Sequence, residues 1–312
     1  MSGKVLLNCA GICVFLVVLP YAVPASLAVD ILIYAIAALA FSLMLGHAGM
    51  LSFGQSAFLA IGAYITGFLL KHYELSAIPL LLLAAVGGAM SAMLVAFLTA
   101  RLKDVYFILM TLAFAQLVYF VAMSWRSVTG GPSGLTGFER PVLSLGFMEI
   151  SLGSNNLYIF SACVMLVIFG MFYALVLSPV GLALRGMKDN AERLQAVGYP
   201  VARYRIFVFT LSGAMTGVAG ALSAFQWLLV PVSKASMNES ANIVFMSILG
   251  GVNAPLGPVV GATVYIWLSD IVSSYWARWP LLFGAFIIFI VFFMRGGIAQ
   301  GVAALPRLFA RR

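Results

Sequence analysis

Long, uninterrupted apolar runs constrain this chain more than any other feature of its sequence. The runs are about 15 to 22 residues long, and of the 312 residues 63% are hydrophobic and only 8% are charged. No water-soluble fold of this size hides so much apolar surface, so lipid is the expected solvent. In lipid the backbone must satisfy its own hydrogen bonds, which leaves helices or closed barrels. Continuous rather than alternating runs favour helices. The sequence therefore predicts an all-α, polytopic membrane protein with one domain over residues 1–312.

About ten membrane segments can be placed on the chain. They begin near Val5, Ser26, Gln55, Ala77, Val105, Leu157, Ile206, Ala241, Gly257 and Leu281. Three of them, those from Gln55, Ala241 and Gly257, are short for a bilayer core that needs about 20 residues, and we expect half-helices or re-entrant pieces there. The first run resembles a signal peptide, but a retained span is favoured because the next run is also membranous. The cysteines Cys9, Cys13 and Cys163 are expected to pack in the core.

Basic residues predict how the chain is oriented. With the N-terminus in the cytoplasm, 12 of the 17 Lys and Arg residues fall inside and 5 outside, which favours both termini in the cytoplasm of a multi-pass inner-membrane protein. Two connections exceed a simple turn. Residues 124–156 lie outside and contain the turn-rich "TGGPSGLTGF", and residues 178–205 lie inside. Neither leaves room for a soluble catalytic domain.

Two glycine-rich polar stretches interrupt the apolar runs. They read "LGHAGMLSFGQSAFLAIGAYI" from Leu45 and "LGGVNAPLGPVVGATVYI" from Leu249, and their similarity suggests an internal duplication. Transporters place their solute near such breaks, because irregular backbone is tolerated at membrane depth only beside protein or a water-filled cavity. We therefore predict a substrate pathway lined by Ser52, Gly54, Gln55, Ser56, Asn253 and Gly257. The alternative is that these residues are close contacts between packed helices.

Acidic and histidine residues give little support to other chemistries. Asp30 and Asp270 fall near the outer ends of their segments, where a solvated or capping role is expected, whereas an ion-coupled carrier favours acids at the midplane. His47 has no acid near it in sequence and is expected to be a hydrogen-bonded packing residue. No histidine cluster, nucleophile motif or paired carboxylates are present, so we expect no catalytic residue, metal or cofactor. The charge pattern also gives no reason to expect nucleic acid as a partner.

The inner connection predicts a short surface helix over residues 178–198. Asp189 and Glu192 lie early in its amphipathic part, and Gly198 followed by Pro200 ends it. Such a helix can also lie on lipid headgroups. The chain has no phosphate-binding loop, because "GLALRGMK" has Met187 where that motif needs Lys. Any ATP-derived energy must therefore come from another protein.

This inner segment resembles the cytoplasmic coupling segment of ABC importer permeases. Glu192 and Gly198 keep the spacing of the Glu-Ala-Ala motif and its following Gly, although Arg193 and Leu194 replace the alanines. The stretch "RGMKDNAERLQAVGYPVARYRIFVFTLSGAMTGVAGAL" is similar to the high-affinity branched-chain amino acid permease family, as are "GHAGMLSFGQSAFLAIGAY" and "LGGVNAPLGPVVGA". The three blocks cover about a third of the chain in the family's order, and the longer outer loop looks most like the M-type subunit.

The resemblance implies a division of labour among subunits. Such a permease pairs with a second related membrane subunit, two cytoplasmic ATP-binding subunits and a periplasmic solute-binding protein, and it has no ATPase site of its own. By this resemblance the ATPase-coupling residues are Arg185, Asp189, Glu192, Arg193 and Gly198. The residues expected to face the binding protein are Arg126, Gly130, Gly131 and Gly134. Branched-chain or related amino acids are the expected solutes. A urea or short-chain amide permease is the alternative within the family, and an ion-coupled secondary transporter is the alternative outside it.

Overall fold

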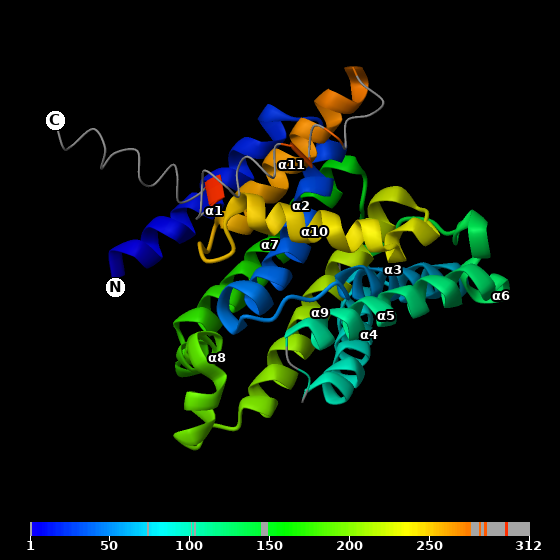
Figure 1. Ribbon diagram of the computed structural model, residues 1–312. Helices are drawn as coiled ribbons and strands as arrows, with labels where there is room; N and C mark the ends of the chain where they lie inside the picture. The colour runs from blue at the N-terminus through cyan, green and yellow to red at the C-terminus, as the bar shows by residue number, and fades with distance from the viewer. Residues whose placement is uncertain are drawn as a thin grey trace.

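The structure is a computed structural model that describes residues 2–73, 75–100, 102, 104–144, 149–275, 281, 284–285 and 297–298. Within these ranges the chain is all-α, as predicted, apart from one small hairpin (Figure 1). The α-helices are α1 (Ser2–Ala22), α2 (Ala25–Ser42), α3 (Gln55–His72), α4 (Ala77–Thr99), α5 (Asp104–Ser124), α6 (Arg126–Thr129), α7 (Ser154–Leu177), α8 (Pro179–Ala196), α9 (Val201–Trp227), α10 (Met237–Gly250) and α11 (Gly257–Tyr275). The hairpin pairs the antiparallel strands β1 (Val142–Ser144) and β2 (Glu149–Ser151).

Among the described residues, five helices are long and apolar enough to cross a membrane. They are Ala25–His47, Ala77–Thr99, Val105–Ser124, Ser154–Leu177 and Val201–Trp227. Of the ten predicted segments, nine coincide with α1 to α5, α7 and α9 to α11, and the one from Leu281 lies almost wholly outside the described residues. The number of helices that span the bilayer therefore stays a prediction.

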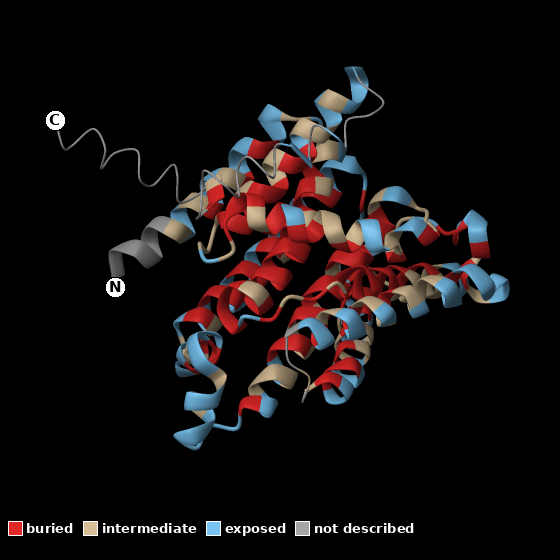
Figure 2. Ribbon diagram, viewed as in Figure 1, coloured by how far each residue is buried: buried red, intermediate tan, exposed pale blue. Residues whose placement is uncertain are grey.

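Helix α2 forms the centre of the molecule. It is apolar on every side, and such a helix is stable only when it is surrounded. Thirteen of its 18 residues are buried, and it packs against α7, α9, α10 and α11. Figure 2 shows buried residues gathered on the central helices and exposed ones along the outer helices and the tip of α8.

Small residues bring α3, α4 and α9 together. A Cβ atom added to Gly62 would lie 2.2 Å from the carbonyl oxygen of Gly217, and one added to Gly88 would lie 2.3 Å from that of Gly213. Backbones approach this closely only where a glycine is present, as in many membrane helix pairs. The outward side of α4 is instead covered by large apolar side chains: Leu82, Leu83, Val86, Met90, Met93, Leu94, Phe97 and Leu98. This face has the character of a lipid-contacting surface.

The helices run back and forth between two ends of the molecule. One, which we call the α8 end, contains α8, the start of α9 and the turn between α10 and α11. The other, the η3 end, contains the 3-10 helix η3 (Val232–Ala235), the start of α2 and the end of α9. Cys9, Cys13 and Cys163 are exposed on α1 and α7, so the prediction that they pack in the core was wrong. A thiol on the lipid-facing side of a helix is already out of water and gains nothing from burial inside the protein. An apolar stretch of sequence therefore did not predict that its cysteine is buried.

Candidate functional site

The first predicted break is a real interruption of the helical backbone. Helix α2 continues into the π-helix η1 (Leu43–His47), residues 48–54 are irregular, and α3 begins at Gln55. Single-turn π segments are rare and gather at functional sites. His47 is buried, lies 3.3 Å through Nδ1 from the carbonyl oxygen of Ser42 and packs edge-on against Phe172. The histidine is thus a hydrogen-bonded packing residue, as expected.

Gln55 lies in a buried polar cluster at the middle of the fold. Its Nε2 atom donates to Ser212 Oγ at 2.9 Å, and Thr216 Oγ1 donates to its Oε1 at 2.7 Å. Ser212 and Thr216 are the twelfth and sixteenth of the 27 residues of α9. Helix α3 therefore begins level with the midpoint of α9, which agrees with the expectation of a discontinuous segment there.

Serine side chains extend this cluster toward α10. Ser240 Oγ donates to Ser56 Oγ at 2.8 Å, and Ser52 Oγ accepts from the Gly54 amide at 3.1 Å. We call Ser52, Gln55, Ser56, Ser212, Thr216 and Ser240 the polar cluster, and none of the six side chains reaches the molecular surface. The predicted pathway residues 52, 54, 55 and 56 are thus brought together, and the polar cluster is satisfied partly by its own side chains and partly by backbone groups, such as the Gly54 amide and the Ala235 carbonyl oxygen.

The second break lies at the α8 end, apart from the polar cluster. Helix α10 ends at Gly250, Gly251 takes the left-handed φ of 103° that turns the chain, and α11 begins at Gly257. A Cβ added to Gly250 would lie 1.7 Å from the carbonyl oxygen of Gly257, so Gly257 is a close backbone contact in the α10–α11 hairpin. Asn253 hydrogen-bonds to Lys188 and to no member of the polar cluster.

Lys188 of α8 joins the two breaks. Its Nζ atom donates to the carbonyl oxygen of Gly46 at 2.7 Å and to Asn253 Oδ1 at 2.7 Å. Ser42 Oγ adds a direct bond of 2.8 Å to the carbonyl oxygen of Val252. A cavity of about 510 Å³ opens beside this contact, lined by residues 48–51 of the first break, by residues 187–192 of α8 and by the start of α5. Lys188 was predicted to lie on the inner side, within the family-like block, but its contact with the two breaks was not predicted. Its partners lie 142 and 65 residues away in the chain and leave no local pattern.

Helix α8 is kinked, which the sequence analysis did not foresee. Asn190 leaves the helical region (φ −161°, ψ 99°), and its Oδ1 accepts from the Arg193 amide at 2.8 Å. Asn190 thereby caps a second short piece, as Asn often does at a helix start. Beyond it lies what we call the α8 tip, residues 190–200, most of which are exposed, and Gly198 (φ 96°) ends the turn as predicted. Arg185, Asp189, Glu192, Arg193 and Gly198 are all exposed, and Arg185 also donates to the Val176 carbonyl oxygen at 2.6 Å, which ties α8 to α7.

The glycine loop, residues 126–137, folds tightly at the η3 end. Gly130, Gly131 and Gly134 have left-handed backbones. Leu135 and Val230 exchange backbone hydrogen bonds of 3.1 and 3.0 Å, and a Cβ added to Gly134 would lie 2.6 Å from the Val230 carbonyl oxygen. These glycines are therefore needed for the loop to pack, and Arg126 is the predicted member whose side chain is exposed.

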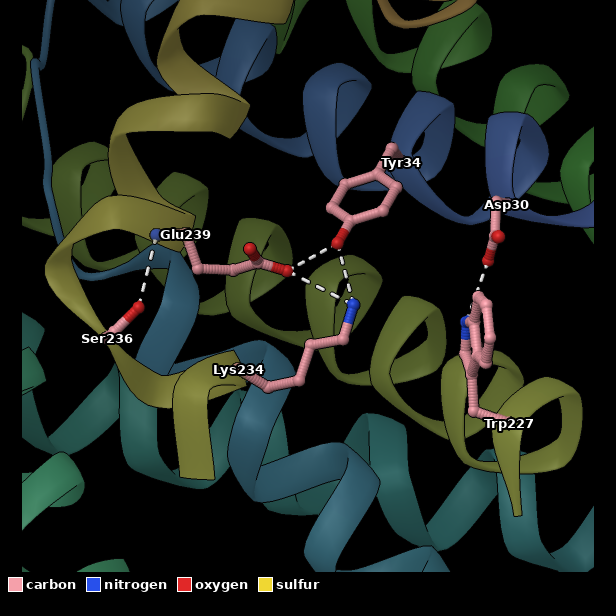
Figure 3. Close-up of polar contacts among 6 residues, drawn as sticks. All are labelled: Asp30, Tyr34, Trp227, Lys234, Ser236 and Glu239. Atoms are coloured by element: carbon pink, nitrogen blue, oxygen red, sulfur yellow. Dashed lines mark hydrogen bonds and ion pairs between the residues drawn. The ribbon is translucent and has the colours of Figure 1, made fainter. Parts of the chain in front are cut away.

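A charged cavity near η3 was missed by the sequence analysis (Figure 3). The Lys234 ammonium donates to the Tyr34 hydroxyl at 2.6 Å and to Glu239 at 3.2 Å, while Tyr34 donates to Glu239. Asp30, one turn before Tyr34, accepts from Trp227 Nε1 at 3.0 Å. The N-cap of α2 is Pro24, so of the solvated or capping role predicted for Asp30 the capping half was wrong. One sequence pattern could have predicted this cavity. Asp30 and Tyr34 are four residues apart on an otherwise apolar helix, so their side chains lie on the same face.

Known proteins resemble this chain over most of its length. Residues 23–294 match the family described as "Branched-chain amino acid transport system / permease component". The chain is 24% identical over 287 residues to the high-affinity branched-chain amino acid transport system permease protein LivM of Salmonella typhimurium, covering 86% of this chain and 68% of that protein. It is 26% identical over 230 residues to the probable branched-chain amino acid transport permease protein LivH of Methanocaldococcus jannaschii, covering 72% of each. No solved structure matches the chain.

A more distant likeness extends to another import system. The autoinducer 2 import system permease protein LsrC of Yersinia pestis is 25% identical over 187 residues, covering 58% of this chain and 50% of that protein. The family match includes both breaks, the α8 tip, the glycine loop and the charged cavity. The chain therefore belongs to the family of permease components of branched-chain amino acid transport systems.

Proposed function

We propose that this chain is a membrane-spanning subunit of an ATP-driven importer that moves branched-chain or related amino acids across the inner membrane. The observation that carries the proposal is the family match over residues 23–294, since it covers nearly all of the described fold. Relatives named as branched-chain amino acid permeases point the same way, including LivM over 86% of this chain. The proposed assembly contains a second related permease, two ATP-binding subunits and a solute-binding protein.

The α8 end is proposed to face the cytoplasm and the ATP-binding subunits. The α8 tip carries Glu192, Arg193 and Gly198 at the spacing of a coupling segment, and Val197 and Tyr199 expose apolar surface there. Exposed apolar groups among charges are typical of a surface that a partner covers. Lys188, just before the tip, is bonded to both breaks. A movement of the tip is therefore passed directly to the interrupted backbone.

The polar cluster is proposed to lie on the solute pathway. A zwitterion in a low-dielectric interior needs polar partners, because an unpaired charge there is very costly. Ser52, Gln55 and Ser56 supply hydroxyl and amide groups where α3 begins, and backbone groups freed at the break add to them. Their present partners are side chains of α9 and α10 and nearby backbone groups, so passage requires these hydrogen bonds to be exchanged for bonds to the solute. Asn253 and Gly257 then act at the α8 end of the pathway, next to Lys188.

The glycine loop is proposed to receive the binding protein at the opposite, outer end. It exposes Arg126 beside the exposed Trp125, and it is held in place by its bridge to Val230. Because Gly130, Gly131 and Gly134 shape the loop, their contribution to docking is indirect. The exposed side chains beside them supply the contacts.

Reconstitution of the full complex tests the proposed function. The chain, its partner permease and both ATP-binding subunits are placed in proteoliposomes, and uptake of leucine, urea and acetamide is measured with the solute-binding protein added. We expect leucine uptake that requires ATP and the binding protein and that urea does not inhibit. Uptake driven by a proton or sodium gradient without ATP would instead make the chain a secondary carrier. Uptake of urea or acetamide alone would overturn the proposed solute class.

A further inference from the structure

The charged cavity at the η3 end combines opposite charges with an apolar wall. It has a volume of about 360 Å³, within the usual range for small-molecule sites. Its polar members are Asp30, Tyr34, Trp227, Lys234, Asn242, Tyr265 and Ser269. Its apolar members are Leu229, Pro231, Met246 and Ile266. Isolated charges inside a membrane protein are expensive and mark functional sites by default.

The cationic side of the cavity is held in place but keeps a free donor. An ammonium group has three N–H donors. Lys234 directs two of them at the Tyr34 hydroxyl and at Glu239, and its side chain is 15% exposed. Glu239 lies in the first turn of α10 and is fixed there because its amide donates to Ser236 Oγ, the cap of the helix, at 3.4 Å. No described residue accepts the third N–H of Lys234, which can therefore bind a carboxylate that enters the cavity.

The anionic side of the cavity, Asp30, can accept further hydrogen bonds. A carboxylate accepts up to about four hydrogen bonds on two oxygens. The one hydrogen bond that the described residues give Asp30 comes from Trp227 Nε1. Figure 3 shows Asp30 and the Tyr34–Lys234–Glu239 group side by side on the same face of α2. An ammonium group bound at Asp30 can therefore belong to the same small molecule as a carboxylate bound at Lys234.

The cavity also joins the two other candidate sites. Leu229 and Pro231 line it, and Val230 between them is bridged to Leu135 of the glycine loop. On the other side, Ser240 follows Glu239 directly and hydrogen-bonds to Ser56 of the polar cluster. The cavity thus lies between the proposed docking surface and the proposed pathway.

We infer that this cavity is a reception site for a zwitterionic α-amino acid with an apolar side chain. Asp30 binds the ammonium group, Lys234 and Tyr34 bind the carboxylate, and Leu229, Met246 and Ile266 contact the side chain. The site accepts the solute at the mouth of the permease before it reaches the polar cluster. This inference rests on the proposed function for the choice of solute, while its chemistry rests on the cavity alone.

A reporter cysteine in the cavity wall tests the inference. Ser269→Cys is introduced into the assembled complex with Cys9, Cys13 and Cys163 replaced by Ser. Ser269 lines the cavity, and its one hydrogen bond to a described residue lies within α11. Its reaction with a small hydrophilic thiol reagent is followed with and without leucine. We expect millimolar leucine to protect the thiol. Leucinamide, which lacks the carboxylate, and 4-methylpentanoate, which lacks the ammonium group, should each protect at least about tenfold less well.

Charge variants assign the two ends of the solute. Asp30→Asn is nearly isosteric and should raise the leucine concentration needed for half-protection by about tenfold or more, while protection by 4-methylpentanoate stays the same. Lys234→Gln should weaken both ligands, and Asp30→Asn decides the matter if the Lys234 variant fails to assemble. Lys71→Met and Asp270→Asn, which remove exposed charges, serve as matched controls and should leave protection unchanged.

The outcomes separate this inference from the proposed function. Leucine uptake by the wild-type complex without protection of the reporter thiol overturns the reception site and leaves the function standing. Protection that is indifferent to the ligand's charged groups, or to Asp30→Asn, also overturns it. Protection by leucine in a complex that imports no leucine supports the site and contradicts the proposed function.

Discussion

At the scale of single residues, Lys188 is the link whose removal should be most informative. Its two hydrogen bonds of 2.7 Å connect α8 to Gly46 and to Asn253. Lys188→Met keeps the apolar stem, which passes Gly49, but removes the ammonium group. Hydrogen bonds to a charged group stabilise a contact strongly enough that we expect uptake to fall by about tenfold when they are lost. ATP hydrolysis by the assembled complex should continue. Both rates are measured in the same proteoliposomes.

The control for Lys188 is a cation at the same end of the molecule. Arg203→Met removes an exposed charge near the start of α9 and should leave the ratio of uptake to hydrolysis at its wild-type value. A Lys188→Met complex that imports and hydrolyses like wild type would show that Lys188 is only a surface contact. A parallel loss of both activities would point to misassembly, which co-purification of the subunits detects.

Gln55 is the residue on which the pathway proposal depends most directly. Gln55→Leu removes the partner of Ser212 and Thr216, although each hydroxyl keeps a backbone acceptor on α2 or α9. We therefore expect a modest loss of stability, about 1–3 kcal/mol, together with a large loss of uptake. Thr66→Val, which removes a buried hydroxyl bonded only within α3, is the matched control for stability. If Gln55→Leu matches that control in both thermal unfolding and uptake rate, Gln55 is a packing residue.

At the scale of elements, the α8 tip should transmit ATP hydrolysis through its shape and charge. Gly198 has a φ of 96°, which costs a side-chain-bearing residue about 1–2 kcal/mol. Gly198→Leu distorts the end of the tip, and Arg193→Glu reverses an exposed charge. Each change should uncouple hydrolysis from uptake. Lys71→Glu at the η3 end provides the charge control, and uptake at the wild-type rate in both tip variants would remove the tip from the coupling surface.

Some of the elements could be predicted from the sequence and others could not. Continuous apolar runs predict helices because lipid leaves the backbone no other partner, and nine helix starts follow from them. Glycine and polar residues that interrupt the apolar runs predict both breaks and the end of α8 at Gly198. The kink at Asn190 and the pairing of β1 with β2 depend on local caps and neighbours that leave little pattern. The charged cavity brings Asp30 together with Lys234 and Glu239, about 200 residues away, which no local pattern records.

At the scale of the whole molecule, the distribution of basic residues predicts which end faces the cytoplasm. Arg185, Lys188, Arg193 and Arg205 lie at the α8 end, and Arg126, Arg140 and Lys234 lie at the η3 end. Over the whole chain, 12 of the 17 Lys and Arg residues fall on the predicted inner side. Because cytoplasmic loops carry the excess of Lys and Arg, we predict that the α8 end is the cytoplasmic one. ATP-binding subunits can reach α8 only in this orientation.

Cysteine labelling from each side of the membrane checks the orientation. Gln195→Cys places a thiol on the exposed α8 tip, and Ser127→Cys places one on the exposed part of α6. In cells whose three native cysteines are replaced by Ser, a membrane-impermeant maleimide should label residue 127 from outside. It should label residue 195 only after the inner membrane is opened, because the reagent cannot cross the apolar core. The reverse pattern would place α8 outside, beyond the reach of any cytoplasmic ATPase, and the whole coupling scheme would then fail.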